Sequence, residues 1–185
     1  GNVEPWASRQ MVRFGVGLLG MVVIAVTDIR LWLRYAYAFY FLVLVLLVAV
    51  ELAGFVGMGA QRWISFGIFN VQPSELMKVA LVLGLARYFH GGSIEDVGRA
   101  MFLIPPLMMV AVPAVLIVRQ PDLGTTLMLV FASIAMFFAA GVRMWKFILA
   151  GILGLIAAPI GWLTVLHDYQ KQRILTFMDP ESDTL

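Results

Sequence analysis

Six long stretches of apolar residues dominate the sequence. They cover about residues 11–27, 35–56, 73–90, 100–118, 123–141 and 145–166, and each is bounded by charged residues or by glycine and proline. A helix needs roughly 20 largely apolar residues to cross the hydrocarbon core of a bilayer. The connections are short, which favours antiparallel packing of neighbouring helices. The sequence therefore predicts an all-α integral membrane protein, with residues 1–185 in a single membrane domain.

Composition supports this class and excludes several others. Hydrophobic residues make up 62% of the chain and charged residues 13%, against about half and a quarter in soluble domains. The absence of cysteine excludes disulfides, zinc–thiolate sites and a thiol nucleophile. His90 and His167 are too far apart to form a metal-ligand motif, so we expect no metal site. The basic residues are scattered singly, and no nucleic-acid surface is predicted.

The fourth stretch contains three prolines, Pro105, Pro106 and Pro113. Proline has no backbone N–H and clashes with the preceding turn, so we expect this helix to bend or break. Such irregularity is tolerated at membrane depth only where protein or a water-filled cavity satisfies the freed carbonyl groups. The prolines thus require that either neighbouring protein or a water-filled cavity bonds the freed carbonyl groups of this helix.

The basic residues leave the membrane orientation open. Six spans place both chain ends on one face, together with the loops near 57–72 and 119–122. That face carries seven basic residues, Arg9, Arg13, Arg62, Lys78, Arg119, Lys171 and Arg173. The opposite face carries six, Arg30, Arg34, Arg87, Arg99, Arg143 and Lys146, which accounts for all 13. The positive-inside rule cannot separate counts this close.

The first polar motif combines GAQRWI, which contains Arg62, with QPSELMK at residues 72–78. Pro73 suits the first turn of a helix, with Gln72 at the cap and Glu75 where the helix dipole favours negative charge. Lys78 follows Glu75 by three residues, so the two can pair. Two interpretations fit this pair. It is either a capping carboxylate with a lysine that reaches the interface, or part of a polar cavity that binds a charged head group.

The second polar motif, RQPDLGTT at residues 119–126, repeats the order glutamine, proline, acid at a helix start. It contains Arg119, Gln120 and Asp122, and by the span count it lies on the same face as the first motif. Two helix N-termini with nearby cations can attract an anionic group such as a pyrophosphate. Asp122 taken alone is also a common helix cap.

Taken in series, GAQRWI, QPSELMK and RQPDLGTT resemble the membrane-loop signatures of the SEDS family (shape, elongation, division and sporulation), in the family's order. The tail HDYQKQRILTFMDPESD resembles the RodA branch of the family more than the FtsW branch. The resemblance covers nearly the whole chain. It implies a ten-span helical bundle, of which this chain supplies the second to seventh spans, with residues 167–185 starting a large extracytoplasmic loop. We therefore expect the chain to be a fragment.

The resemblance also implies a function. The family polymerises lipid II into glycan strands, here of the RodA type for cell elongation and rod shape, as a multi-pass protein of the bacterial cytoplasmic membrane. The implied partners are a class B penicillin-binding protein, other membrane proteins of the elongation complex and membrane lipid, but no nucleic acid. The residues that match the family's polar cavity, and its neighbouring motif positions, are candidates for substrate binding: Arg62, Gln72, Glu75, Lys78, Arg119, Gln120 and Asp122.

The catalytic residue stays unassigned, because the acid usually treated as catalytic in this family lies beyond Leu185. The fragment alone is therefore not expected to polymerise. Glycosyl transfer needs a proton acceptor and positive groups that stabilise the departing pyrophosphate. We expect Arg62 and Lys78 to hold the diphosphate, with Glu75 and Asp122 fixing their geometry. No cofactor is visible, and a divalent cation remains compatible with this chemistry.

Three alternatives stay open from the sequence. Bent helices with buried charges also occur in transporters, so a flippase for a lipid-linked precursor fits the pattern. Small residues between Gly15 and Gly20 permit close helix contact, as in a scaffold that binds a partner's membrane helix. The third alternative is an FtsW-like protein of cell division.

Overall fold

The computed structural model describes residues 4–53, 55–57, 60–65, 70–120 and 122–164. The longer helices are α1 (Glu4–Val26), α2 (Ile29–Ala53), α3 (Pro73–His90), α5 (Ala100–Arg119), α6 (Leu123–Ala139) and α7 (Met144–Thr164), with the short helix α4 (Ile94–Gly98) before α5. Three strands, β1 (Phe55–Gly57), β2 (Ala60–Ser65) and β3 (Asn70–Val71), lie between α2 and α3. The chain divides into two compact units, Gly1–Tyr35 and Ala36–Leu185, with the boundary inside α2.

The expected helical class is confirmed, and the differences lie at the element boundaries. α1 and α2 begin several residues before the apolar stretches do, at Glu4 and Ile29. α2 ends at Ala53, and residues expected in the second span lie in β1. An apolar stretch marks the residues that can lie in the hydrocarbon core of a bilayer. The helix itself continues as long as its backbone hydrogen bonds do, so its ends need not coincide with the ends of the apolar stretch. Within the described residues, Ile29–Leu52 and Ala100–Arg119 are long and apolar enough to cross a membrane.

The strands form a small antiparallel sheet in the order β1-β2-β3, which the sequence did not predict. Phe55 pairs with Trp63 and Gly57 with Ala60, while Ser65 pairs with Asn70. Backbone that leaves a helix still has to pair its N–H and C=O groups. The sheet provides this pairing between the end of α2 and Pro73, and it leads the chain directly into the first polar helix start.

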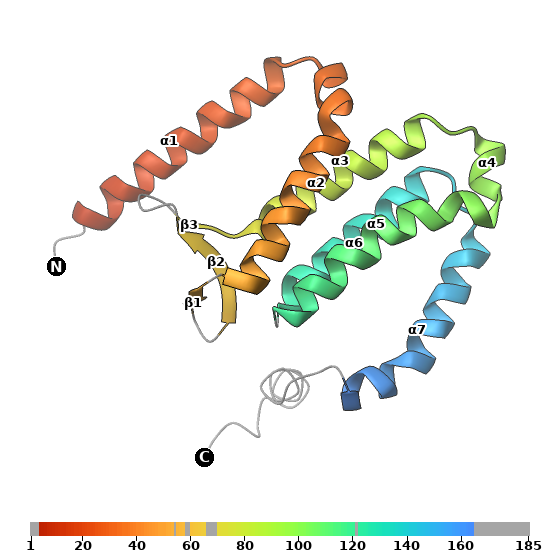
Figure 1. Cartoon of the computed structure of the whole chain (residues 1–185). Coiled ribbons are helices and arrows are strands. Elements are labelled where there is room, and N and C mark those ends of the chain that lie inside the picture. Colours follow the sequence, from red (N-terminus) through yellow and green to blue (C-terminus); the bar gives the residue numbers. More distant parts are fainter. Residues whose placement is uncertain (1–3, 54, 58–59, 66–69, 121, 165–185) are drawn as a thin grey trace. The chain divides into compact units, whose positions relative to one another are not determined.

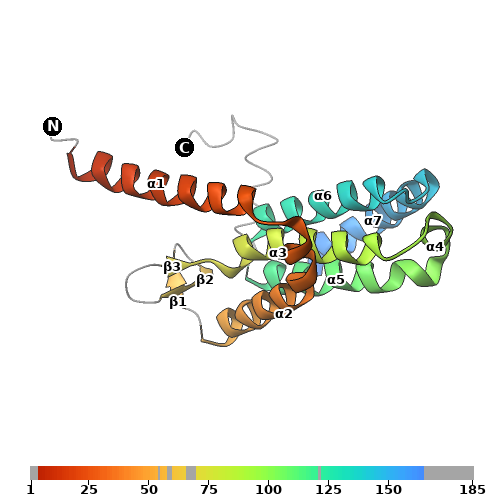
Figure 2. The ribbon, with the colours of Figure 1, turned by 90° about the horizontal axis from the view of Figure 1, so that it is seen from above.

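The core of the second unit lies among α2, α3, α5 and α6. α3, α5 and α6 lie side by side in both views (Figure 1, Figure 2). Leu47 of α2, Met77 and Leu81 of α3, Ile117 of α5 and Leu129 of α6 are fully or almost fully buried. α3 and α5 approach closely at Gly84, where an added Cβ would lie 2.7 Å from the terminal methyl group of Met109.

α5 runs unbroken through its three prolines, so the expected break is absent. Pro106 and Pro113 lack the N–H groups that would bond the carbonyls four residues earlier, those of Phe102 and Met109. Two tyrosine hydroxyls take their place. Tyr40 of α2 donates to the Met109 carbonyl at 2.9 Å, and Tyr88 of α3 donates to the Phe102 carbonyl at 2.8 Å. Of the two expected ways to satisfy the freed carbonyls, neighbouring protein or a water-filled cavity, the structure shows neighbouring protein at both buried prolines.

Candidate functional site

The start of α3 holds the first polar motif. Gln72 occupies the N-cap position in an extended conformation, and its side chain does not cap the helix. Pro73 and Ser74 are buried, and Glu75 lies in the first turn. The Lys78 ammonium lies 2.9 Å from a Glu75 carboxylate oxygen, with side-chain exposures of 25% for Lys78 and 54% for Glu75. The predicted pair is thus formed, with the cation more sheltered than the anion.

The start of α6 holds the second polar motif. Asp122 is the N-cap residue, and its carboxylate accepts hydrogen bonds from the Thr125 backbone N–H at 3.2 Å and the Thr125 hydroxyl at 2.8 Å. The Thr126 hydroxyl donates to the Asp122 carbonyl at 2.8 Å. The capping interpretation of Asp122 is therefore confirmed.

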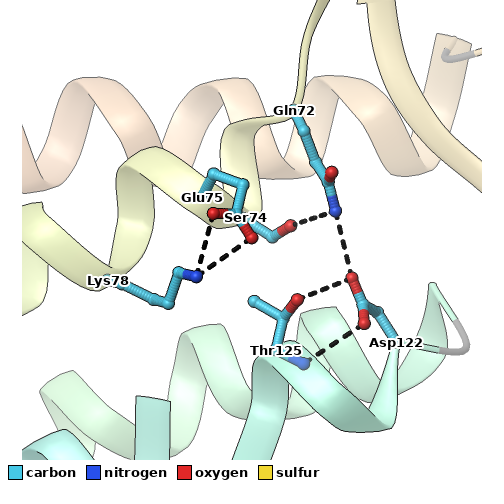
Figure 3. A network of polar contacts seen from close by, with 6 residues as sticks. All are labelled: Gln72, Ser74, Glu75, Lys78, Asp122 and Thr125. Carbon is cyan, nitrogen blue, oxygen red and sulfur yellow. Dashed lines mark hydrogen bonds and ion pairs between the residues drawn. The ribbon is translucent and has the colours of Figure 1, made fainter. Parts of the chain in front are cut away.

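Gln72 joins the two helix starts (Figure 3). Its amide donates to the Ser74 hydroxyl at 3.0 Å and to the Asp122 carboxylate at 3.1 Å, across 50 residues of sequence. The prediction that the two motifs lie on the same face of the bundle is confirmed by this contact. The N-terminal ends of α3 and α6 therefore lie together, and their dipoles add positive potential at one place.

Gln120 extends this polar region toward α2. It is 4% exposed, and its side-chain amide donates to the Leu47 carbonyl at 3.0 Å. In a helix, the Leu47 carbonyl is normally bonded by the N–H of residue 51. A second donor on the same carbonyl ties the end of α5 to the last turns of α2. Gln120 thus holds the C-terminal end of α5 against α2.

The structure says less about the two arginine candidates. Arg119 lies in the last turn of α5 with an exposed side chain. Arg62 belongs to β2, but its side chain lies outside the described part of the structure. Glu75 and Asp122 were expected to fix the geometry of Arg62 and Lys78, and this remains untested for Arg62, whose side chain is not described. Among the described side chains, the Asp122 carboxylate contacts Gln72 and Thr125, which hold the two helix starts together.

Two contributors escaped the sequence analysis, Ser74 and Thr125. Both stand inside the quoted motifs, and both sit next to or within a helix cap, where hydroxyl groups commonly bond to side chains and backbone. Their position near a helix cap was the feature of the sequence that could have identified them as part of the site. The described cluster contains two carboxylates, Glu75 and Asp122, against the one ammonium of Lys78. Across the described residues, no group of three or more His, Cys, Asp and Glu side chains comes together as a metal site.

The burial pattern of α6 defines the class of protein. Its inward face contains Thr125, Thr126 and Ser133 beside Leu129 and Phe137, while Phe131 and Phe138 on the outward face are 65% and 63% exposed. A helix that turns small polar residues inward and large apolar residues outward suits a hydrocarbon surrounding. The described charged residues from Ala36 to Thr164 lie within two turns of the ends of the long helices or in the connections between them. The fold and the site together are those of a helical membrane protein with a polar cluster where the N-terminal ends of α3 and α6 meet.

The chain belongs to the FtsW–RodA–SpoVE family of cell cycle proteins, whose family model matches residues 2–185. The peptidoglycan glycosyltransferase MrdB of Escherichia coli K12 is 36% identical over 183 residues, which cover 96% of this chain and 47% of MrdB. The probable peptidoglycan glycosyltransferase FtsW of Aliivibrio salmonicida is 35% identical over 177 residues, covering 95% of this chain and 43% of that protein. The chain thus spans about half the length of these relatives.

Two solved structures are similar in fold. One is a chain from a study of how a peptidoglycan synthase complex coordinates polymerization and crosslinking. It matches with a TM-score of 0.79 and 31% identity over 94% of this chain and 51% of that chain. The other is the rod shape determining protein RodA of Thermus thermophilus, with a TM-score of 0.69 and 31% identity over 82% of this chain and 49% of that chain.

Proposed function

We propose that this chain forms the substrate-binding half of a peptidoglycan glycosyltransferase that polymerises lipid II. The observation that carries the proposal is the Gln72–Asp122 contact, which brings two helix N-termini and the Glu75–Lys78 pair to one end of an apolar bundle. Two helix N-termini attract a diphosphate carried on a lipid when Arg62 and Arg119 add their charges to that of Lys78 and outweigh the two carboxylates of the cluster. The relatives named as peptidoglycan glycosyltransferases support the reaction class.

Within this proposal each polar residue has a role. Lys78 binds the diphosphate, and Glu75 holds its ammonium at 2.9 Å. Arg62 from β2 and Arg119 from α5 supply further positive charge. Asp122, through Gln72, fixes the two helix starts relative to each other. We assign no residue of the described cluster as the proton acceptor for the attacking hydroxyl group, because the Glu75 carboxylate pairs with Lys78 and the Asp122 carboxylate is bonded to Gln72 and Thr125.

The wider architecture is part of the same proposal. In a protein of its relatives' length, the chain contributes six of ten spans to a multi-pass protein of the bacterial cytoplasmic membrane, with the polar cluster facing outward. We place it in the RodA branch, with a class B penicillin-binding protein as partner. Identities of 36% to MrdB and 35% to FtsW support both branches about equally, so the division role is the alternative. A flippase for a lipid-linked precursor remains the second alternative, since α5, although unbroken, carries three prolines within the helix.

The test is lipid II binding and polymerisation by a protein of the relatives' length that contains this chain. Lys78→Ala should lower lipid II affinity and turnover at least tenfold, since it removes a charge-assisted contact to phosphate. Lys78→Arg should restore part of the binding. Arg87→Gln, a cation in the last turn of the same helix, is the matched control and should leave both unchanged. Wild-type affinity and turnover for Lys78→Ala would remove Lys78 from the site and with it the proposed binding mode.

A further inference from the structure

Gln120 ends α5 and lies inside the bundle. It is the C-cap residue of this helix, its backbone N–H bonds the Leu116 carbonyl at 3.2 Å, and the residue is 4% exposed. Its side-chain amide donates to the Leu47 carbonyl of α2 at 3.0 Å, across 73 positions of sequence. A residue this deeply buried within the chain offers little surface to a substrate. It can influence a bound head group only through the residues that it holds.

Directional contacts tie α5 to α2 at two levels. Tyr40 donates to the Met109 carbonyl at 2.9 Å in the middle of α5, and Gln120 bonds the Leu47 carbonyl at its end. The surrounding core includes Leu47 and Ile117, but apolar packing is not directional. Two hydrogen bonds at different levels fix the tilt of α5 against α2, whereas one alone leaves that tilt free.

The end of α5 also holds the N-cap residue of α6. The Asp122 N–H bonds the Ile117 carbonyl in the last turn of α5 at 3.2 Å. The Asp122 carboxylate in turn accepts the Gln72 amide at 3.1 Å, directly before α3 begins (Figure 3). Three hydrogen bonds in series therefore run from α2, through the end of α5 and the start of α6, to the start of α3.

A small tilt of α5 is enough to break the last bond of this series. Gln120 follows Met109 by 11 residues, which is about 16 Å of α-helix, so a tilt of about 5° at Met109 moves the end of α5 by about 1.4 Å. The bond from Gln72 to Asp122 is 3.1 Å long, close to the upper limit of about 3.2 Å for N–H···O hydrogen bonds. The contact between the two helix starts therefore depends on the tilt that Gln120 sets.

We propose that Gln120 is a positioning residue for the polar cluster at the starts of α3 and α6. Its amide sets the tilt of α5, and through Asp122 and Gln72 it holds the two helix starts together, without touching the substrate itself. This inference rests on the proposed function, since the cluster that Gln120 positions is the one proposed to bind the lipid diphosphate. Its structural part, the spacing of the two helix starts, can be measured without any substrate.

The first test measures that spacing in the 185-residue chain in detergent. The chain contains no cysteine, so Val79→Cys and Leu127→Cys, at exposed positions of α3 and α6, confine two spin labels to these helices. Pulsed electron paramagnetic resonance then gives the distribution of distances between the labels. Gln120→Met keeps the length of the side chain and removes its N–H donors. It should broaden the distribution by about 1–2 Å, the movement expected for the end of α5.

Ser133→Ala is the matched control for this measurement. Ser133 is also a buried polar residue, at 3% exposure, but its hydroxyl donates to the Leu129 carbonyl of its own helix at 2.8 Å. Its loss removes a buried hydrogen bond without releasing one helix from another, so the distance distribution should stay as in the wild type. A distribution that is unchanged in Gln120→Met, or equally broadened in Ser133→Ala, would overturn the proposal.

The second test measures lipid II affinity in a protein of the relatives' length that contains this chain. Gln120→Met should weaken binding about five-fold, which corresponds to the coupling expected between residues of one hydrogen-bond network. The double variant Gln72→Leu/Gln120→Met should bind no more weakly than Gln72→Leu alone, because both changes break the same series of contacts.

Two results of the affinity test would refute the positioning role. One is wild-type affinity for Gln120→Met, and the other is independent losses that multiply in the double variant, as a general loss of stability would give. Lys78→Ala separates this failure from failure of the proposed function. It still loses affinity if only the role of Gln120 is wrong, and it keeps wild-type affinity if the proposed binding mode is wrong.

Discussion

Replacing Tyr40 by phenylalanine removes one hydroxyl group from the contact between α2 and α5 and leaves the ring in place. The Met109 carbonyl then loses its donor, because Pro113 provides no N–H. Tyr40 is 4% exposed, so water cannot easily substitute. Leaving a buried acceptor unsatisfied costs about 1–3 kcal/mol, and hydrogen bonds between membrane helices contribute up to about 1.7 kcal/mol. We expect Tyr40→Phe to lower the free energy of unfolding by about 1–2 kcal/mol.

The decisive comparison places the same change in a Pro113→Ala background. Alanine restores the N–H that bonds the Met109 carbonyl, so Tyr40→Phe should then cost no more than about 0.5 kcal/mol. Unfolding of the chain in mixed micelles with increasing denaturing detergent, followed by circular dichroism, gives the four free energies of the cycle. Tyr37→Phe, which alters a 38% exposed tyrosine on the same helix, is the control and should be neutral. Equal costs in both backgrounds would refute the view that Tyr40 serves the freed carbonyl.

Four further predictions follow from the described contacts. Tyr88→Phe should cost about 1–2 kcal/mol, and Pro106→Ala should remove most of that cost in the same unfolding assay, because the Phe102 carbonyl regains its donor. Gly84→Ala should cost less than about 1 kcal/mol, since only a flexible methionine end must move, whereas Gly84→Ile should cost about 1–3 kcal/mol or more through overpacking. Gln72→Leu should destabilise the chain by about 1–2 kcal/mol and weaken lipid II binding in a protein of the relatives' length, and unchanged binding would contradict the bridging role. The pKa of Asp96 lies below the usual 3.8, because hydrogen bonds from Ser93 and then the charge of Arg99 favour its carboxylate. Since the folded-state pKa is depressed, the contribution of this cap to stability is present above pH 3.8 and is lost as the pH falls through the lowered pKa. An NMR titration of Ser93→Ala should show the pKa of Asp96 moving back up.

The helical class and most helix positions could be predicted from sequence alone. These features depend on short-range rules: apolar length, proline in a first turn and an acid at a cap. The start of α3 at Pro73 and the Glu75–Lys78 pair follow directly from such local spacing. The boundaries of α1 and α2 did not follow, because a helix extends as far as its backbone hydrogen bonds continue. The strands between α2 and α3 were missed, because short polar segments that pair with each other have no strong periodic pattern.

The sequence by itself determined that this chain places polar motifs at the starts of apolar helices, and that the prolines of α5 free carbonyls that require donors. Only the tertiary structure decided which residues meet those requirements. Gln72 reaches Asp122 across 50 positions, and Tyr40 reaches Met109 across 69. Contacts at such separations depend on which helix faces pack together. Many other side chains of similar chemistry could have made the same hydrogen bonds, so the sequence alone does not identify the partners.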